Sequence, residues 1–184
     1  MPIYNYTDHV VLMTGGTSGI GRAAAEAFAA SGASVVIAAR DAERGRAVVE
    51  DLDGEVTFFQ TDVGDPDAVR HLVQEAVATY GRLDVAVKNA AGRTGTGKPT
   101  HAFEVDEFDA TVDVALRGVW VGMKHQVQQM LTQDEAARQL RAHPRRSVAA
   151  VARAVGYTSR SHFSRQFKKH HSLAPSRWQR EARR

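Results

Sequence analysis

A glycine-rich turn near the N-terminus constrains the fold of this 184-residue chain more than any other feature. An apolar run at residues 9–13 leads into a turn that carries Gly15, Gly19 and Gly21, and an alanine-rich segment of helical composition follows up to residue 30. Strand, glycine turn and helix in this order are typical of a β-α unit whose helix N-terminus accepts a phosphate. The turn therefore predicts an α/β fold with a nucleotide site.

The same unit recurs along the chain. Apolar or β-branched runs at 34–39, 56–60 and 83–87 predict three more strands, and helical patterns at 42–52 and 65–80 separate them. Alternating apolar strands and amphipathic helices favour a parallel sheet that is covered on both faces. Right-handed crossovers then predict a partial doubly wound, Rossmann-type sheet of four strands in the order 3-2-1-4.

A long helix is expected over residues 106–131. Phe108, Leu116, Trp120, Met123 and Val127 follow one helical face, and no fifth strand is predicted after the helix. The strand at 83–87 would then be an edge strand beside an apolar helical surface without a partner. Such edges and patches favour association, so we expect a homodimer through the 106–131 helix.

The last third of the chain predicts a small all-α helix-turn-helix domain. Ser147 is a good N-cap for a short helix that Gly156 ends, and Ser159 is a good N-cap for a second helix at 160–170. Two short helices joined by a tight glycine turn are the helix-turn-helix arrangement. We therefore expect three parts: a dinucleotide-binding domain (1–131), a linker helix (132–146) and a helix-turn-helix domain (147–184).

Charge divides the chain in the same way. Residues 1–133 hold 11 Lys and Arg against 18 Asp and Glu, for a net charge of −7, whereas residues 134–184 hold 13 against 3, for a net charge of +10. A dense basic segment with helical signals favours a polyanionic partner, here double-stranded DNA. The chain has no cysteine, which excludes disulfides and thiolate zinc sites, and no metal site is predicted. No signal peptide or apolar membrane span is recognised, so a cytoplasmic location is expected.

The glycine turn, read as T-G-x-x-x-G-I-G, resembles that of the short-chain dehydrogenase/reductase family, and residues 83–92 resemble that family's Asn-Asn-Ala-Gly strand end. The resemblance covers residues 8 to about 131. It implies a nicotinamide dinucleotide site in which Asp62 contacts the adenine and Arg40 accepts a 2′-phosphate, which favours NADP over NAD. A solvated Arg40, neutralised by Asp41, is the alternative. The cofactor-binding residues that the resemblance implies are Gly15, Thr17, Ser18, Gly19, Ile20, Gly21, Arg40, Asp62, Val63, Asn89 and Ala90.

Departures from that family pattern bear on catalysis. Ala115 stands where the family has its catalytic asparagine, and Lys88 and Ala91 replace an asparagine and a glycine beside the nicotinamide end. None of the four tyrosines is followed four residues later by lysine, so the general acid of the family's Tyr-x-x-x-Lys pair is missing. We therefore predict no catalytic residue and only weak NADP (or NAD) binding.

The segment 147–178 resembles the second helix-turn-helix of AraC-family transcription regulators, and residues 132–144 resemble the end of that family's linker helix. The resemblance implies that the helix from Arg160 enters the major groove and that further cations bind phosphates. The alternative is that the cations only solubilise a small helical bundle. The DNA-binding residues implied are Arg160, Ser161, His162, Arg165, Lys168, Lys169 and Arg177.

These observations favour a sequence-specific DNA-binding, regulator-like protein fused to a catalytically incomplete dehydrogenase fragment that binds NADP. Two alternatives stay open. One is an NAD(P)-dependent short-chain oxidoreductase whose missing catalytic groups come from a partner chain, and the other is a non-functional fusion of two gene fragments.

Overall fold

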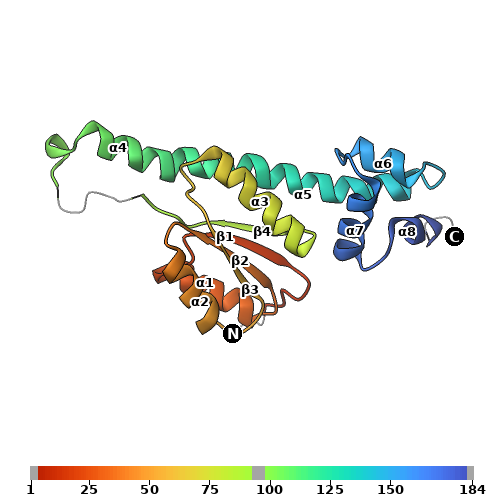
Figure 1. Ribbon diagram of the computed structural model, residues 1–184, viewed down its shortest axis with the longest axis horizontal. Helices are drawn as coiled ribbons and strands as arrows, with labels where there is room; N and C mark the ends of the chain where they lie inside the picture. The colour runs from red at the N-terminus through yellow and green to blue at the C-terminus, as the bar shows by residue number, and fades with distance from the viewer. Residues whose placement is uncertain (1–3, 93–97, 182–184) are drawn as a thin grey trace.

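A four-stranded parallel sheet forms the first half of the molecule (Figure 1). The computed structural model describes residues 4–92 and 98–181. Its strand order is β3-β2-β1-β4, which confirms the order predicted from the sequence. The strands are β1 (Val10–Thr14), β2 (Ser34–Ala39), β3 (Val56–Gln60) and β4 (Val85–Lys88). β4 begins at Val85, two residues later than predicted. The N–H of Leu83 donates to the side chain of Gln133, and the N–H of Asp84 donates to the carbonyl of Val10 at the start of β1.

Helices cover both faces of the sheet (Figure 1). Successive residues of a strand point to opposite faces, so Val10 and Leu12 pack toward α3 whereas Val11 and Met13 pack toward α1 and α2. These side chains are at most 3% exposed. The helices of this half are α1 (Gly19–Ala30), α2 (Ala42–Asp51) and α3 (Pro66–Tyr80).

One long helical rod connects the sheet to the C-terminal helices (Figure 1). It consists of α4 (Val105–Val112), a π-helical stretch (Asp113–Gly118) and α5 (Val119–Ala142), and a short 3₁₀ turn (Thr100–Ala102) precedes it. The helix continues through residue 131, where a domain boundary was predicted, so the predicted linker is helical up to residue 142 and the chain has no backbone break at that boundary.

The apolar face of this rod has no partner within the described part of the chain, as the sequence predicted. The side chains of Phe108, Leu116, Trp120, Met123 and Val127 are 47–67% exposed. The rod instead turns a mixed face toward the sheet, made of small, aliphatic and amide residues. Its buried members are Val114, Gly118, Val121, Gly122, Gln126 and Gln133. This buried face was not predicted from the sequence, because the rod packs on α3 and β4 through close backbone contact and amide hydrogen bonds, for which apolar periodicity is no guide.

Three short helices end the chain: α6 (Val148–Ala154), α7 (Arg160–His171) and α8 (Pro175–Glu181). They share one apolar cluster with the end of α5, which contributes Ala136 and Leu140 to a core around Phe163 and Phe167. Because α5 supplies part of this core and α7 also packs on α3, the structure does not show a separate helix-turn-helix domain. Within residues 4–92 and 98–181, no helix combines the length and apolar character that a bilayer crossing requires.

Candidate functional site

The glycine turn between β1 and α1 is closed so tightly that its key positions exclude a side chain. Gly15 has φ +72°, and a Cβ added there would lie 2.8 Å from the backbone nitrogen of Ala90. A Cβ at Gly21 would lie 2.2 Å from the Gly15 carbonyl oxygen. Gly19 also has a positive φ, of +51°, but open space surrounds its missing Cβ. Glycine is thus required at Gly15 and Gly21 by close packing and at Gly19 by backbone conformation.

Side chains at the ends of β1 and β4 hold this turn in place. The Thr14 hydroxyl accepts hydrogen bonds from the backbone N–H groups of Asn89 and Ala90, each at 3.3 Å. The Asn89 amide donates to the Gly15 carbonyl at 2.8 Å. The two strand ends on either side of the turn are therefore cross-linked, which fixes the position of the turn relative to the sheet.

The N-terminus of α1 opens at this turn without an internal cap. Ser18 is its N-cap in extended conformation, and its hydroxyl makes no capping hydrogen bond. The first turn of α1 carries no acidic residue. Unsatisfied N–H groups and the positive end of the helix dipole make this end of the 12-residue helix a suitable site for a phosphate.

A pocket of about 340 Å³ lies beside this helix end, at the carboxyl edge of the sheet. The strand order changes direction at β1, so the pocket occupies the crevice where open α/β sheets bind ligands. Its lining combines residues of the glycine turn, the ends of β2, β3 and β4, and the long rod. They are Gly15, Thr17, Ser18, Ala38, Ala39, Arg40, Asp41, Thr61, Asp62, Val63, Asn89, Ala90, Ala91 and Val114.

Most predicted cofactor residues meet in this pocket, with three exceptions. Gly19 and Gly21 shape the turn and do not line the pocket, and Ile20 is 83% exposed. The pocket also includes residues that the sequence analysis did not assign to cofactor binding, among them Thr61 and Val114. Thr61 follows β3 directly, so its position at a strand end was a usable signal. Val114 comes from the rod, and no local pattern indicated that it would reach the pocket.

Arg40 and Asp41 lie side by side at the pocket but differ in their contacts. The Asp41 carboxylate caps α2 by accepting from the Arg44 N–H at 3.0 Å, and it lies 3.9 Å from the Arg44 Nε. Arg40 is exposed, and among the described residues it has no ion-pair partner within 4.0 Å. Asp41, the alternative neutralising partner for Arg40, is thus engaged with Arg44 instead.

Lys88 turns away from the pocket. Its ammonium donates to the side-chain oxygen of Gln126 on α5, and its Cε approaches the backbone of Gly122. Burial lowers the pKa of Lys88 to about 8. The Lys88 side chain therefore ties β4 to α5.

Tyr80 and Tyr157 occupy structural positions. The Tyr80 hydroxyl lies 2.6 Å from the Thr57 hydroxyl, and burial raises the Tyr80 pKa. Tyr157 packs edge-on against Phe163, and burial raises its pKa too. Raised pKa values keep these phenols neutral, and neither residue lines the pocket.

The caps predicted for the C-terminal helices are confirmed. The Ser147 hydroxyl accepts from the Ala150 N–H at 3.1 Å, and the Ser159 hydroxyl accepts from the His162 N–H at 3.3 Å. Gly156 has φ +87° just after α6, as expected of the residue that ends a helix.

The predicted DNA contacts divide between two sides of α7. The members on α7 are all exposed: Arg160, Ser161, His162, Arg165, Lys168 and Lys169. His162 also lines a groove between α7, α3 and α5, and the Lys169 ammonium donates to the carbonyl oxygens of α3. Arg177 on α8 lies 3.4 Å from Glu181. The structure thus places His162 and Lys169 against the first half of the molecule, because α7 packs on α3.

The profile of the short chain dehydrogenase family matches residues 9–165. This chain belongs to the short-chain dehydrogenase family. It is 40% identical over 128 residues to a 3beta-hydroxysteroid dehydrogenase of Mediterraneibacter gnavus, covering 68% of this chain and 46% of that protein. It is 37% identical over 163 residues to the sex determination protein tasselseed-2 of Zea mays, covering 83% of this chain and 46% of that protein.

Solved structures agree with this assignment. The crystal structure of levodione reductase superposes with a TM-score of 0.64 at 33% identity, covering 72% of this chain and 52% of that one. A short-chain dehydrogenase/reductase from Brucella melitensis gives a TM-score of 0.65 at 26% identity, covering 69% of this chain and 54% of that one. The chain spans about half the length of the relatives it matches.

These similarities bear differently on the two expected halves. The family match runs past residue 131 into α7, so it supports an oxidoreductase-family assignment across the predicted junction. It gives no support to an AraC-type assignment of residues 147–184. The oxidoreductase reading, which the sequence analysis held as an alternative, is therefore the better supported of the two.

Proposed function

We propose that this chain binds a nicotinamide dinucleotide, preferably NADP(H), as the cofactor-binding part of a short-chain oxidoreductase. The observation that carries the proposal is the glycine turn, where added Cβ atoms at Gly15 and Gly21 would collide with backbone while the α1 N-terminus stays open toward the pocket. A cradle made of backbone alone fits a pyrophosphate.

Each part of the dinucleotide has a candidate binding group in the pocket. Thr17, Ser18 and the first N–H groups of α1 would hold the pyrophosphate, and Asp62 would bond the adenine. Asn89 and Ala90, at the end of β4, would border the nicotinamide end. When bound, the cofactor supplies hydride transfer, and the protein positions it.

The preference for NADP rests on Arg40. Its guanidinium lies at the pocket without an ion-pair partner among the described residues, whereas Asp41 is engaged with Arg44. A free guanidinium at the end of β2 suits a 2′-phosphate.

Proton transfer is not provided by this sequence. Ala115 stands at the family's asparagine position and is exposed, and no tyrosine is followed four residues later by lysine. We propose that reduction of a ketone or oxidation of an alcohol requires groups from outside these 184 residues. The chain alone should bind the dinucleotide but should not catalyse either reaction.

Fluorescence titration with NADPH and NADH tests this proposal. We expect tighter binding of NADPH, and we expect Arg40→Ala to abolish that preference. Arg46→Ala, an exposed arginine on α2 that does not line the pocket, is the matched control. Failure of both dinucleotides to bind would overturn the proposal, and tighter binding of NADH would overturn the role of Arg40. Turnover of a ketone panel above a no-enzyme control, lost in Gly19→Trp, would show that the chain supplies its own acid.

A second copy of the chain is the partner we propose for the exposed apolar side of the rod. Val105, Phe108, Leu116, Trp120, Met123, Val127 and Leu131 are large apolar side chains along the rod, and each is 47–72% exposed. Two copies related by a two-fold axis would place the same apolar side of each chain against the other and remove it from water.

Duplex DNA is a second candidate ligand, for the C-terminal helices. Three observations favour it: the capped α6-turn-α7 arrangement, the exposed cations Arg160, Arg165 and Lys168, and the net charge of +10 in residues 134–184. A basic helix that follows a tight turn suits major-groove binding. A mobility shift of a random duplex library tests it, and the absence of any shift would remove it.

A further inference from the structure

The C-terminal end of α3 is the place where α7 packs against the sheet half. The Lys169 ammonium donates to the carbonyl oxygens of Ala78 and Thr79, at 3.1 and 2.7 Å. These carbonyls belong to the last turn of α3, which has no helical N–H partners for them. A cation here satisfies free acceptors and complements the negative end of the helix dipole.

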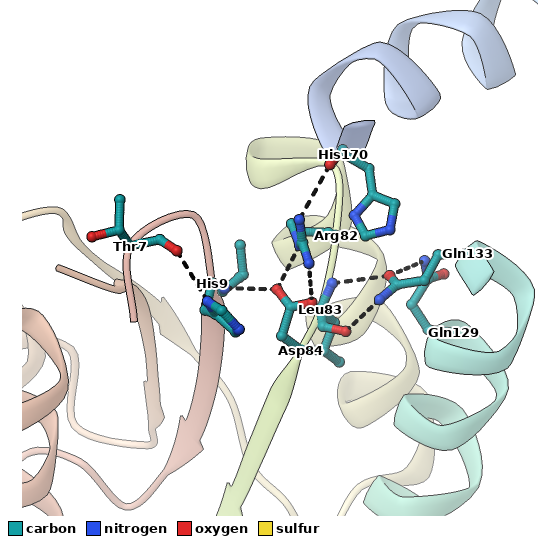
Figure 2. A network of polar contacts seen from close by, with 9 residues as sticks. Thr7, His9, Arg82, Leu83, Asp84, Gln129, Gln133 and His170 are labelled. Carbon is teal, nitrogen blue, oxygen red and sulfur yellow. Dashed lines mark hydrogen bonds and ion pairs between the residues drawn. The ribbon is translucent and has the colours of Figure 1, made fainter. Parts of the chain in front are cut away.

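A second contact lies next to it (Figure 2). Arg82 bonds both oxygens of Asp84, each at 2.6 Å, and its third N–H group donates to the carbonyl of His170 at 3.2 Å. Asp84 also accepts from the N–H of Val10, at 2.9 Å. The end of α7 is thereby joined, through one arginine and one carboxylate, to the starts of β4 and β1.

Gly81 lies close against α7. It ends α3 in left-handed conformation, with φ +85°. A Cβ added there would lie 2.5 Å from the Cβ of Lys169 and 3.2 Å from the Oε1 of Gln166. The lysine Cβ is fixed to its backbone, so a side chain at residue 81 requires α7 and the end of α3 to move apart.

Packing in this position conflicts with groove binding by α7. The major groove is about 12 Å wide and an α-helix with side chains is about 10–12 Å across, so an inserted helix has phosphate backbone on both flanks. On α7 one flank faces α3, with Lys169 bound to it and His162 lining the groove between the two helices. The half that lies there, residues 1–133, also has a net charge of −7 and repels phosphates.

We propose that the contact between α7 and the end of α3 is autoinhibitory: the sheet half holds the basic helix in a position that limits its access to duplex DNA. The inference rests on the second candidate function and adds its regulation. Opening the contact frees the Lys169 ammonium from the carbonyl oxygens of α3 and moves the acidic half away from the bound phosphates.

Gly81→Asn tests the proposal without changing charge. Asparagine is the non-glycine residue that best tolerates left-handed backbone, so the main effect is the wedge against Lys169. Gly54→Asn is the matched control, because Gly54 also has positive φ, of +109°, while its added Cβ makes an ordinary contact with Ala29 at 3.4 Å. Two quantities are measured: hydrogen exchange of α7 and of the end of α3, and affinity for a short random-sequence duplex at fixed salt.

We expect Gly81→Asn to speed exchange in both helices and to tighten DNA binding about tenfold or more, because apparent affinity rises with the open fraction. Gly54→Asn should do neither. Lys169→Met is the second variant: loss of a phosphate contact weakens binding, whereas release of α7 strengthens it, so the two roles predict opposite signs.

Faster exchange in Gly81→Asn with unchanged or weaker DNA binding overturns the autoinhibitory role and leaves the DNA proposal standing. Unchanged hydrogen exchange in both Gly81→Asn and Lys169→Met shows that these contacts do not hold α7, and this result also overturns the autoinhibitory role. If the parent and an opened variant both fail to bind DNA, the second candidate function falls together with its regulation. Dinucleotide titration of the same samples shows whether the sheet half has stayed folded.

Discussion

The sheet half and the C-terminal helices pack by different means. In the sheet half, the inner strand residues Val11, Leu12 and Met13 are fully buried, and the turn at Gly15 and Gly21 leaves no room for a methyl group. The C-terminal helices instead pack around aromatic rings, with Gln166 Oε1 and His170 Nδ1 buried and without a hydrogen-bond partner in the described structure. The first half should therefore respond mainly to added volume, and the second mainly to charge and hydrogen bonding.

The largest effect is expected from Gly21→Ala. The added methyl meets the Gly15 carbonyl at 2.2 Å, and neither backbone segment can yield without opening the turn. We expect a loss of about 3 kcal/mol in the free energy of unfolding and loss of dinucleotide binding. Urea unfolding and fluorescence titration measure both. Ala23→Val, at an exposed position of the same helix, should change each only slightly. A Gly21→Ala protein that still binds NADPH would show that the sheet half is less sensitive to volume than we infer.

The rod between the two halves is the next test. Trp120 is 58% exposed at the middle of the apolar stripe. If two copies pair there, Trp120→Lys should weaken the dimer by about 2 kcal/mol or more, which is roughly a thirtyfold change in dissociation constant. Sedimentation at micromolar concentration measures it, with Gln128→Lys, exposed beside the stripe, as control. A parent protein that sediments as a monomer contradicts the pairing.

His170 should make the C-terminal half sensitive to acid. Burial, and secondarily the positive charge of Arg82, lowers its pKa to about 4, against about 6.5 in an unfolded chain. Between these values the unfolded state binds more protons, so the free energy of unfolding decreases as the pH falls through that window. Urea midpoints measured across this range should fall less steeply in His170→Gln, whereas His143→Gln, an exposed position, should follow the parent. Parallel curves for all three proteins would exclude this contribution.

The smallest effect is expected at a helix cap. Ser159→Ala removes the acceptor for the His162 N–H at the start of α7 and should cost about 1 kcal/mol. Ser159→Asp should retain the stability, because aspartate caps equally well. Urea unfolding distinguishes these outcomes, and an unchanged Ser159→Ala protein would mean that the packing of α7 on α3, α6 and α8 holds the helix without the cap.

Local patterns in the sequence determined much of this protein. The glycine spacing, the four apolar strands and their order, and the caps at Ser147 and Ser159 follow from steric and hydrogen-bonding rules that act over a few residues. Most residues of the cofactor pocket were also predictable, because parallel strands bring their carboxyl ends to one edge.

Tertiary structure alone decided the buried face of the rod, the role of Lys88 and the placement of α7. Each depends on contacts between segments far apart in the chain: Gln126 with Lys88, Gln133 with Leu83, and Lys169 with the end of α3. Amide and ammonium groups make these contacts, and their partners are backbone or side-chain oxygens that any segment can supply. Apolar periodicity identified the stripe that lacks a partner among the described residues, but it gave no sign of the mixed face that is buried, because that face packs through small residues and amide groups.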